Sequence, residues 1–217
     1  MKLIIKITIF LVLILRLPAQ IIQNEEQSQT FYFDVVCFKN IDTANSQIDG
    51  RADVLVMIPY QTLRFEKEQD AFTSNYEIYY DIYDTSGKKV LSDKVKKTII
   101  ENDYSVTQGS TAGFEIIPKS FLLNLGNYIV QINLIDLVSG KTYTKSRNIS
   151  IVKFEKYRIS LSGIMLISAI EEKQGKYKIT PHISDNIGIL PDGFFIFFEV
   201  YNNKNFDSLL KNFNSNS

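Results

Sequence analysis

Hydrophobic and polar residues alternate with a period of two along most of the chain after residue 30. The alternation is clearest from Tyr76 to Tyr83, where Tyr76, Ile78, Tyr80 and Ile82 share one face. β-Branched and aromatic residues in this pattern favour a half-buried strand. The same pattern predicts seven strands, over residues 31–38, 53–58, 76–83, 90–100, 114–117, 128–135 and 143–152.

Turn-forming residues separate these strands. Pro59 and Pro118 follow the second and the fifth strand, and proline cannot donate to a strand ladder. Asp84 to Gly87 and Asp136 to Gly140 end in glycines that adopt positive φ without strain. We therefore expect an all-β protein whose residues 31–153 form an Ig-like or fibronectin-III-like antiparallel sandwich.

A second β pattern follows a short linker at residues 154–158. Residues 159–201 contain three strand signals, at 164–170, 177–180 and 194–201, and the aromatic run at 194–198 is interpreted as sheet core. Three strands are too few to close a sandwich, so a partial second β domain is expected. Its unpaired backbone and apolar surface predict a partner or self-association. Residues 202–217 form a polar tail, rich in Asn and Ser, that is expected to be disordered.

The N-terminal pattern is typical of a signal peptide at residues 1–19. Lys2 and Lys6 precede the apolar run 7–15, and the segment ends at Ala19. The run is shorter than the about 20 residues of a bilayer-spanning helix, so no stable transmembrane span is expected after cleavage. An uncleaved anchor is the alternative. The leader predicts an exported protein, periplasmic or extracellular, with a flexible N-terminus at residues 20–30.

Composition narrows the function further. The 217 residues include 24 basic and 24 acidic side chains, one His, one Cys and no Trp. A net charge near zero argues against nucleic acid as a partner. With one Cys and one His, the chain has too few of the usual ligands for a typical zinc site.

No sequence motif for nucleotide binding, hydrolysis or metalloprotease chemistry occurs, so a non-catalytic protein without cofactor or metal is expected. His182, which follows Pro181, is interpreted as a solvated loop residue rather than a catalytic base. Cys37 is interpreted as a buried, inert thiol, with an intermolecular disulfide as the alternative.

Four aspartates and two tyrosines remain as candidate binding residues. The aspartates could bind calcium at a strand end, although turn stabilisation accounts for two of them; they are Asp34, Asp81, Asp84 and Asp136. Tyr79 and Tyr83 lie opposite the core face of their strand. Exposed tyrosine rings stack on sugars, but we favour an arrangement in which both faces of that sheet are covered.

The order of these segments resembles the N-terminal part of GWxTD domain-containing proteins, an exported bacterial family, mostly from Bacteroidetes and Ignavibacteria. The resemblance covers residues 31–202 and uses segments 33–36, 54–59, 63–65, 84–87, 125–128, 159–164 and 198–202. Gly163 stands where relatives carry Asp. Without a Trp, the chain lacks the C-terminal Gly-Trp-x-Thr-Asp segment, and no function residing there carries over. The family has no agreed activity, so the resemblance implies architecture and export.

Together these patterns predict a non-catalytic structural or protein-interaction module of the bacterial cell envelope. The expected partner is another envelope protein or the missing C-terminal domain, with self-association through residues 159–201 as a further possibility. The alternative is a carbohydrate-binding module that uses surface tyrosines.

We predict that the mature protein begins at Gln20, because the positive residues, the apolar run and Ala19 act together as a cleavage signal. N-terminal sequencing of periplasmic material checks this prediction. Recovery of the intact chain from Met1 in the membrane fraction would contradict it.

Overall fold

The computed structural model describes residues 30–41, 48–153, 159–184, 190 and 193–201. The expected signal peptide, the N-terminal residues 20–29, the linker 154–158 and the tail 202–217 lie outside the described residues. In the described part the regular elements are β-strands and three short 3-10 turns, η2 (Tyr60–Thr62), η3 (Tyr104–Val106) and η4 (Gly109–Thr111). The protein is therefore all-β, as its alternation predicted.

Eight antiparallel strands form a sandwich of two sheets. The first sheet has the order β1-β2-β6 and contains β1 (Tyr32–Lys39), β2 (Gly50–Pro59) and β6 (Phe114–Leu123). The second contains β3 (Glu66–Glu68), β4 (Ala71–Asp84), β5 (Lys89–Glu101), β7 (Gly126–Asp136) and β8 (Thr142–Ile151). Its order is β3-β4-β7-β8, with β5 also paired to β4. Connections that cross between two such sheets are typical of immunoglobulin-like and fibronectin-III-like domains.

The sandwich core lies between the two sheets and is built by the predicted alternation. Seven side chains of β4 and β7 are fully buried: Tyr76, Ile78, Tyr80, Ile82, Val130, Ile132 and Leu134. They belong to one cluster with Val54, Val56 and Ile58 of β2. Tyr128, also expected inside, is only partly buried, and its hydroxyl donates to the Asn124 carbonyl, 3.1 Å away. This hydrogen bond is the tyrosine corner found at the start of the corresponding strand in Ig-like sandwiches.

Two details of the strands differ from the prediction. β3 is an additional strand of three residues, too short to give a periodic signal. β6 does not end at Pro118 but continues through it to Leu123. Among the described strands β6 pairs only with β2, so Pro118 occupies an edge strand, where a missing N–H is tolerated.

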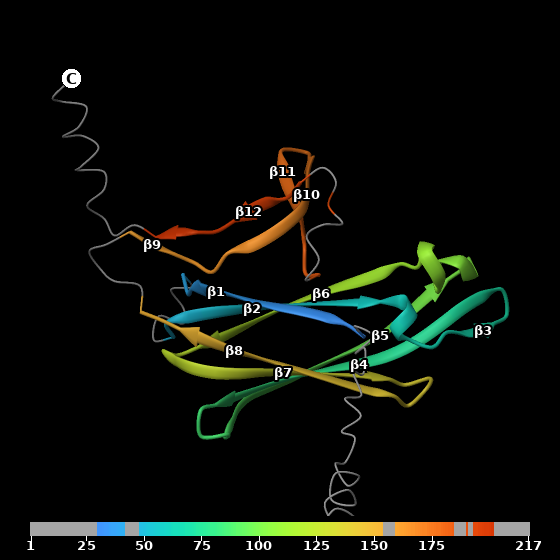
Figure 1. Ribbon diagram of the computed structural model, residues 1–217, viewed down its shortest axis with the longest axis horizontal. Helices are drawn as coiled ribbons and strands as arrows, with labels where there is room; N and C mark the ends of the chain where they lie inside the picture. The colour runs from blue at the N-terminus through green and yellow to red at the C-terminus, as the bar shows by residue number, and fades with distance from the viewer. Residues whose placement is uncertain (1–29, 42–47, 154–158, 185–189, 191–192, 202–217) are drawn as a thin grey trace, which may run out of the picture.

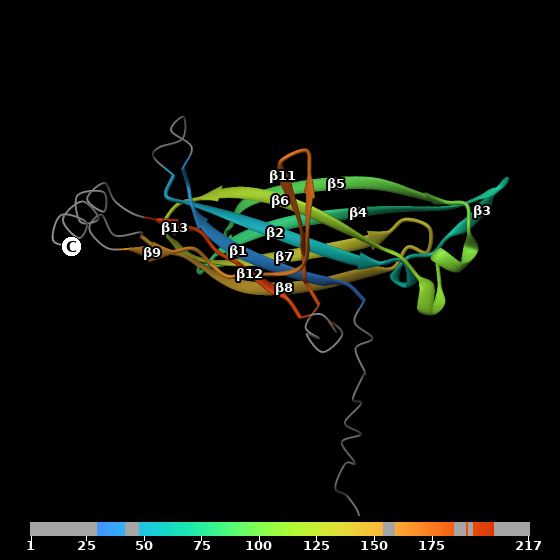
Figure 2. The same cartoon turned by 90° about the horizontal axis from the view of Figure 1, so that it is seen from above.

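The second unit, residues 159–201 as far as they are described, forms two small sheets. One has the order β11-β10-β12, and the other pairs β13 with β9. The strands are β9 (Ser160–Leu161), β10 (Met165–Lys173), β11 (Lys176–Pro181), β12 (Phe195–Phe197) and β13 (Val200–Tyr201). Figure 1 shows this unit lying over the β1-β2-β6 sheet, so that the molecule has three layers. Figure 2 shows β9, β12 and β13 running above β1 and β2.

The second unit shares a core with the sandwich. Val36, Phe38 and Leu55 from the outer face of the β1-β2-β6 sheet cluster with Met165, Ile167 and Ile183. The Phe38 and Phe197 rings lie 6.3 Å apart, centroid to centroid. The inner face of the second unit is therefore covered by the sandwich.

Gly163 lies at the closest approach of the two parts. Its N–H donates to the Cys37 carbonyl at 2.8 Å. A Cβ on Gly163 would lie 3.1 Å from the Cys37 backbone nitrogen, closer than nine in ten real Cβ contacts. The contact explains why a residue without a side chain occupies this position in this chain.

We predict that Ile132→Ala lowers the free energy of unfolding by about 2–5 kcal/mol, because it removes fully buried methyl groups and leaves a cavity. Ile129→Ala on the same strand is the matched control, since Ile129 is 38% exposed; its cost should stay below about 1 kcal/mol. Chemical denaturation measures both. Equal effects for the two variants would contradict the sidedness of β7.

Candidate interaction surface

The outward face of the second unit carries a row of apolar cross-strand pairs. In the β10–β12 pairing, Met165 lies opposite Phe197 and Leu166 opposite Ile196. Met165 and Phe197 contact the sandwich, so alternation directs Leu166 and Ile196 outward. Continued by two residues, the same register brings Ile164 opposite Phe198. We call the outward set the outer ladder; it consists of Leu161, Ile164, Leu166, Ile196, Phe198 and Val200, with Leu161 and Val200 paired between β9 and β13.

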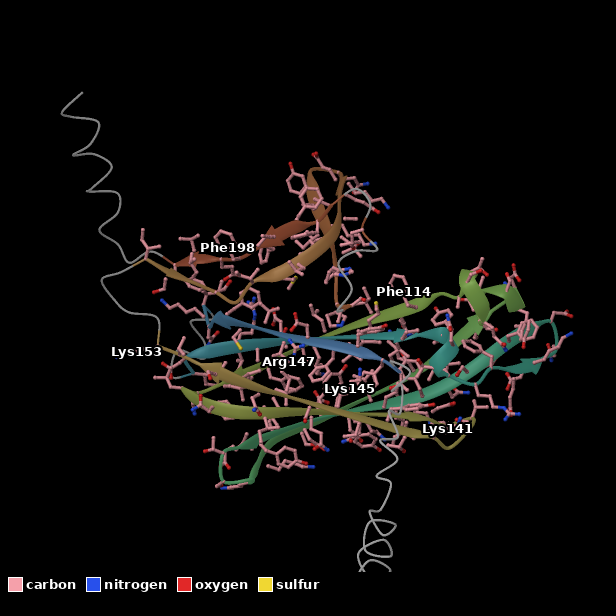
Figure 3. The ribbon with its side chains drawn as sticks, in the orientation of Figure 1. Phe114, Lys141, Lys145, Arg147, Lys153 and Phe198 are labelled. Atoms are coloured by element: carbon pink, nitrogen blue, oxygen red, sulfur yellow. The ribbon has the colours of Figure 1, made fainter. Side chains whose placement is uncertain are left out.

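The outer ladder is exposed although its members are apolar. Five of its side chains are between 44% and 63% exposed: Leu161, Ile164, Ile196, Phe198 and Val200. Figure 3 shows Phe198 on the second unit, beyond the β1-β2-β6 layer of the sandwich. Residues 194–198 were interpreted as sheet core; Phe197 packs against the shared cluster, but Phe194, Phe195, Ile196 and Phe198 are between 43% and 55% exposed.

Polar contacts fix the other side of this unit to the sandwich. The Tyr201 hydroxyl accepts from the Lys39 N–H at 2.9 Å and donates to the Glu199 carboxylate at 2.6 Å. Arg51 lies 3.6 Å from the same carboxylate, and the Glu199 N–H donates to the Ser162 hydroxyl. Burial, together with the bond to Glu199, raises the pKa of Tyr201, so it stays a neutral donor. Because β13 is held from the inside, the outer ladder faces away from the sandwich.

His182 does not occupy the solvated loop position predicted for it. The residue is half-buried, its N–H donates to the Leu166 carbonyl at 2.9 Å, and it lines a cavity of about 360 Å³ between the second unit and the sandwich. Its Nε2 atom is buried and has no hydrogen-bond partner among the described residues. The packing of 159–201 on the first sheet, which the sequence did not predict, accounts for this burial.

Asp136 lines a cavity of about 610 Å³ at the end of the sandwich near η3 and η4. Its carboxylate accepts from the N–H groups of Arg64, Val138 and Ser139 and from the Ser139 hydroxyl. These bonds use both oxygens to hold the β7–β8 turn and the segment after η2. Asp136 is thus engaged as a turn-stabilising residue.

The other three candidate aspartates also have separate partners. Asp34 pairs with Arg147, and Asp81 pairs with Lys89 at 2.9 Å. The Asp84 carboxylate accepts from the Ser86 hydroxyl at 2.6 Å and from the backbone N–H groups of Lys88 and Ser86, so it stabilises its own turn. These bonds, the one from the Ser86 hydroxyl first, lower its pKa. Within the described ranges no group of three or more His, Cys, Asp or Glu side chains could hold a metal ion.

Tyr79 and Tyr83 lie on the outer face of the sheet formed by β5, β4, β7 and β8. The second unit packs on the opposite sheet, so this outer face has no described element over it (Figure 1). The expectation that both faces of this sheet are covered is therefore wrong for the described part of the chain. Both tyrosines are half-buried, and a lysine ammonium lies over each ring, at 5.3 Å for Lys94 and 5.6 Å for Lys89.

Comparison with known proteins gives no family. No family model matches the sequence, and no curated protein matches it. Among solved structures, a Bacteroides uniformis β-glucuronidase is 12% identical over 57% of this chain, with a TM-score of 0.33. Bacteroides uniformis β-glucuronidase 2, covalently bound to cyclophellitol-6-carboxylate aziridine, is 9% identical over 56% of this chain, with a TM-score of 0.32. This chain spans 13% of the length of each. The X-ray structure of the structural-genomics target SoR45 is 12% identical over 60% of this chain and 96% of its own, with a TM-score of 0.27.

The described residues contain no helix with the length and hydropathy needed to cross a membrane.

We predict that the Cys37 thiol is alkylated slowly while the chain is folded. Burial, followed by the charges of Asp34 and Asp53, raises the pKa of Cys37 to about 11. At pH 8 about one thiol in a thousand is then ionised, against about a quarter for an ordinary cysteine. The rate of iodoacetamide labelling of the folded chain should rise about a hundredfold from pH 8 to pH 10. The rate for the chain unfolded in urea should rise only about fourfold. Equal slopes would contradict the raised pKa.

Proposed function

We propose that this chain is a non-catalytic protein-interaction module of the bacterial cell envelope. The outer ladder carries the proposal, because it gathers six apolar side chains on one outward face, four of them in the cross-strand pairs Leu166–Ile196 and Leu161–Val200, and five of them at least 44% exposed. Soluble monomers rarely leave a contiguous apolar patch of this kind in water, and larger ones mark interaction sites. The partner is another envelope protein that covers this face.

The outer ladder has the composition of an interface centre. It is free of charged side chains, whereas exposed Glu171, Glu172 and Lys173 follow at the far end of β10. An apolar centre within a polar rim is the usual anatomy of a protein–protein interface. The shared core and the bonds of Tyr201 and Glu199 hold the ladder in place before a partner arrives, which lowers the ordering cost of association.

Two further observations support the assignment. The pattern at residues 1–19 supports export, and the resemblance to GWxTD domain-containing proteins agrees with an envelope location. The candidate acids Asp34, Asp81, Asp84 and Asp136 are engaged in ion pairs or turns rather than gathered at one site. This distribution supports a binding role over a catalytic one.

We predict that the isolated chain self-associates through the outer ladder, because a second copy supplies an apolar face that can cover it. Ile164→Lys combined with Ile196→Lys places two charges on the ladder and leaves the inner face untouched. The variant should sediment as a monomer and should not bind a hydrophobic dye. The unaltered chain should sediment as an oligomer and bind the dye. Sedimentation velocity from micromolar to near-millimolar concentration measures this.

Ile100→Lys is the matched control, since Ile100 is 65% exposed on β5, remote from the second unit. It should associate and bind dye like the unaltered chain. Point substitutions are preferred to deletion of residues 159–217, because deletion would expose Val36, Phe38 and Leu55 and create a new apolar patch. An unaltered chain that stays monomeric and binds no dye over the whole range would sink the proposal.

A further inference from the structure

The open face of the second sheet is a regular grid whose rows follow from strand register. Tyr79 of β4 lies opposite Asn133 of β7, and Tyr83 lies opposite Ile129. Between these rows, Asp81 lies opposite Gln131. β8 extends the three rows with Thr144, Ser146 and Asn148. All of these residues occupy outward positions, since the alternate residues of β4 and β7 form the core.

Apart from Asp81, the polar side chains of this grid are neutral, and two of them have unused hydrogen-bonding groups. The Asn133 carbonyl oxygen accepts from the Thr144 hydroxyl at 2.8 Å and from the Gln131 amide at 3.3 Å. In the described part of the chain, the Asn133 amide nitrogen has no acceptor, and the Gln131 carbonyl oxygen has no donor. Amides that both donate and accept match the hydroxyl groups of a sugar better than they match an apolar protein face.

Two ion pairs neutralise most of the charge on this face. Lys94 lies 3.1 Å from the Glu77 carboxylate, and Lys89 lies 2.9 Å from that of Asp81. The Ser92 hydroxyl also donates to the Asp81 carboxylate, and Asp81 is only 7% exposed. Burial alone would raise the pKa of Asp81, but the hydrogen bonds from Lys89 and Ser92 outweigh it and lower the pKa. Lys96 of β5, also exposed, lies opposite Glu77, so the face carries a small net positive charge, and β4 separates this lysine from the amides of β7.

Tyr79 and Tyr83 provide two aromatic surfaces on one strand. Four residues at about 3.3 Å each separate their Cα atoms by about 13 Å, more than one sugar ring spans. The Tyr79 hydroxyl donates to Glu77, two residues earlier on the same face, so its ring leans along the strand. The lysines that lie over the rings are nearly half exposed, and their long carbon chains can move aside.

We propose that this face binds a neutral oligosaccharide that lies along β4, with sugar rings on Tyr79 and Tyr83 and hydroxyl groups on Gln131 and Asn133. The apolar face of a sugar packs on the tyrosine ring, while the amides of β7 bind its polar edge. This site is separate from the outer ladder, because the whole sandwich lies between the two (Figure 1).

Isothermal titration of the full chain tests the proposal with defined probes. The neutral probes are hexasaccharides of cellulose, xylan, mannan and amylose, and the acidic probe is hexagalacturonate. At least one neutral probe should bind, and Tyr79→Ala and Tyr83→Ala should each weaken it about tenfold or more, which equals about 1.4 kcal/mol. Tyr83→Phe, which keeps the ring, should retain binding.

Tyr177→Ala is the matched control, since Tyr177 is a 72% exposed tyrosine on β11 of the second unit; it should bind as the unaltered chain does. The Ile164→Lys, Ile196→Lys variant should also keep saccharide binding, which separates this proposal from the one above. If an alanine variant unfolds, amide shift changes in the unaltered chain on saccharide addition must map to β4 and β7. No binding by any neutral probe, binding that survives both alanine substitutions, or shifts confined to the second unit would overturn the proposal.

Discussion

The structure depends on one sheet that is apolar on both faces. In β2, Val54, Val56 and Ile58 point into the sandwich, and Leu55 points into the cluster with the second unit. Full burial of such a side chain is worth about 1.5–3 kcal/mol, so each of the two interfaces draws its stability from this sheet. The second unit has too few strands to bury its own apolar face. It is held in place because β1 and β2 supply the missing half of its core.

This middle sheet also decides which surfaces remain free. With both its faces covered, the molecule keeps two outer faces of different chemistry: the apolar outer ladder, and the neutral polar grid with its two tyrosines. The edge at β8 is protected by charge. Figure 3 labels Lys141, Lys145, Arg147 and Lys153 on and beside β8, the outermost strand beyond β7, and charged side chains at an edge discourage pairing with another chain. Association is thereby directed to the faces.

The sequence predicted the parts of the fold that local alternation controls, and it did not predict how they meet. Period-two patterns located β4 and β7 and identified Ile78 and Ile132 as core, because one residue per pair must face the same way. Alternation does not say which neighbour covers a face. The burial of His182 and the exposure of Ile196 therefore followed only from the packing of residues 159–201 on β1 and β2. The continuation of β6 past Pro118 depends on its edge position, which is likewise a property of the sheet and not of the segment.

The candidate surfaces show the same limit. Tyr79 and Tyr83 were recognisable as a pair on one face, but the amides of Gln131 and Asn133 join them only through the register of β4 with β7. The outer ladder was hidden within a run read as core, because its partners at Leu161 and Ile164 lie more than thirty residues away in the sequence. The ladder and the grid lie on opposite outer faces, so a protein on one does not obstruct a saccharide on the other. Both can be occupied at once, and coupling between them would have to pass through the shared middle sheet.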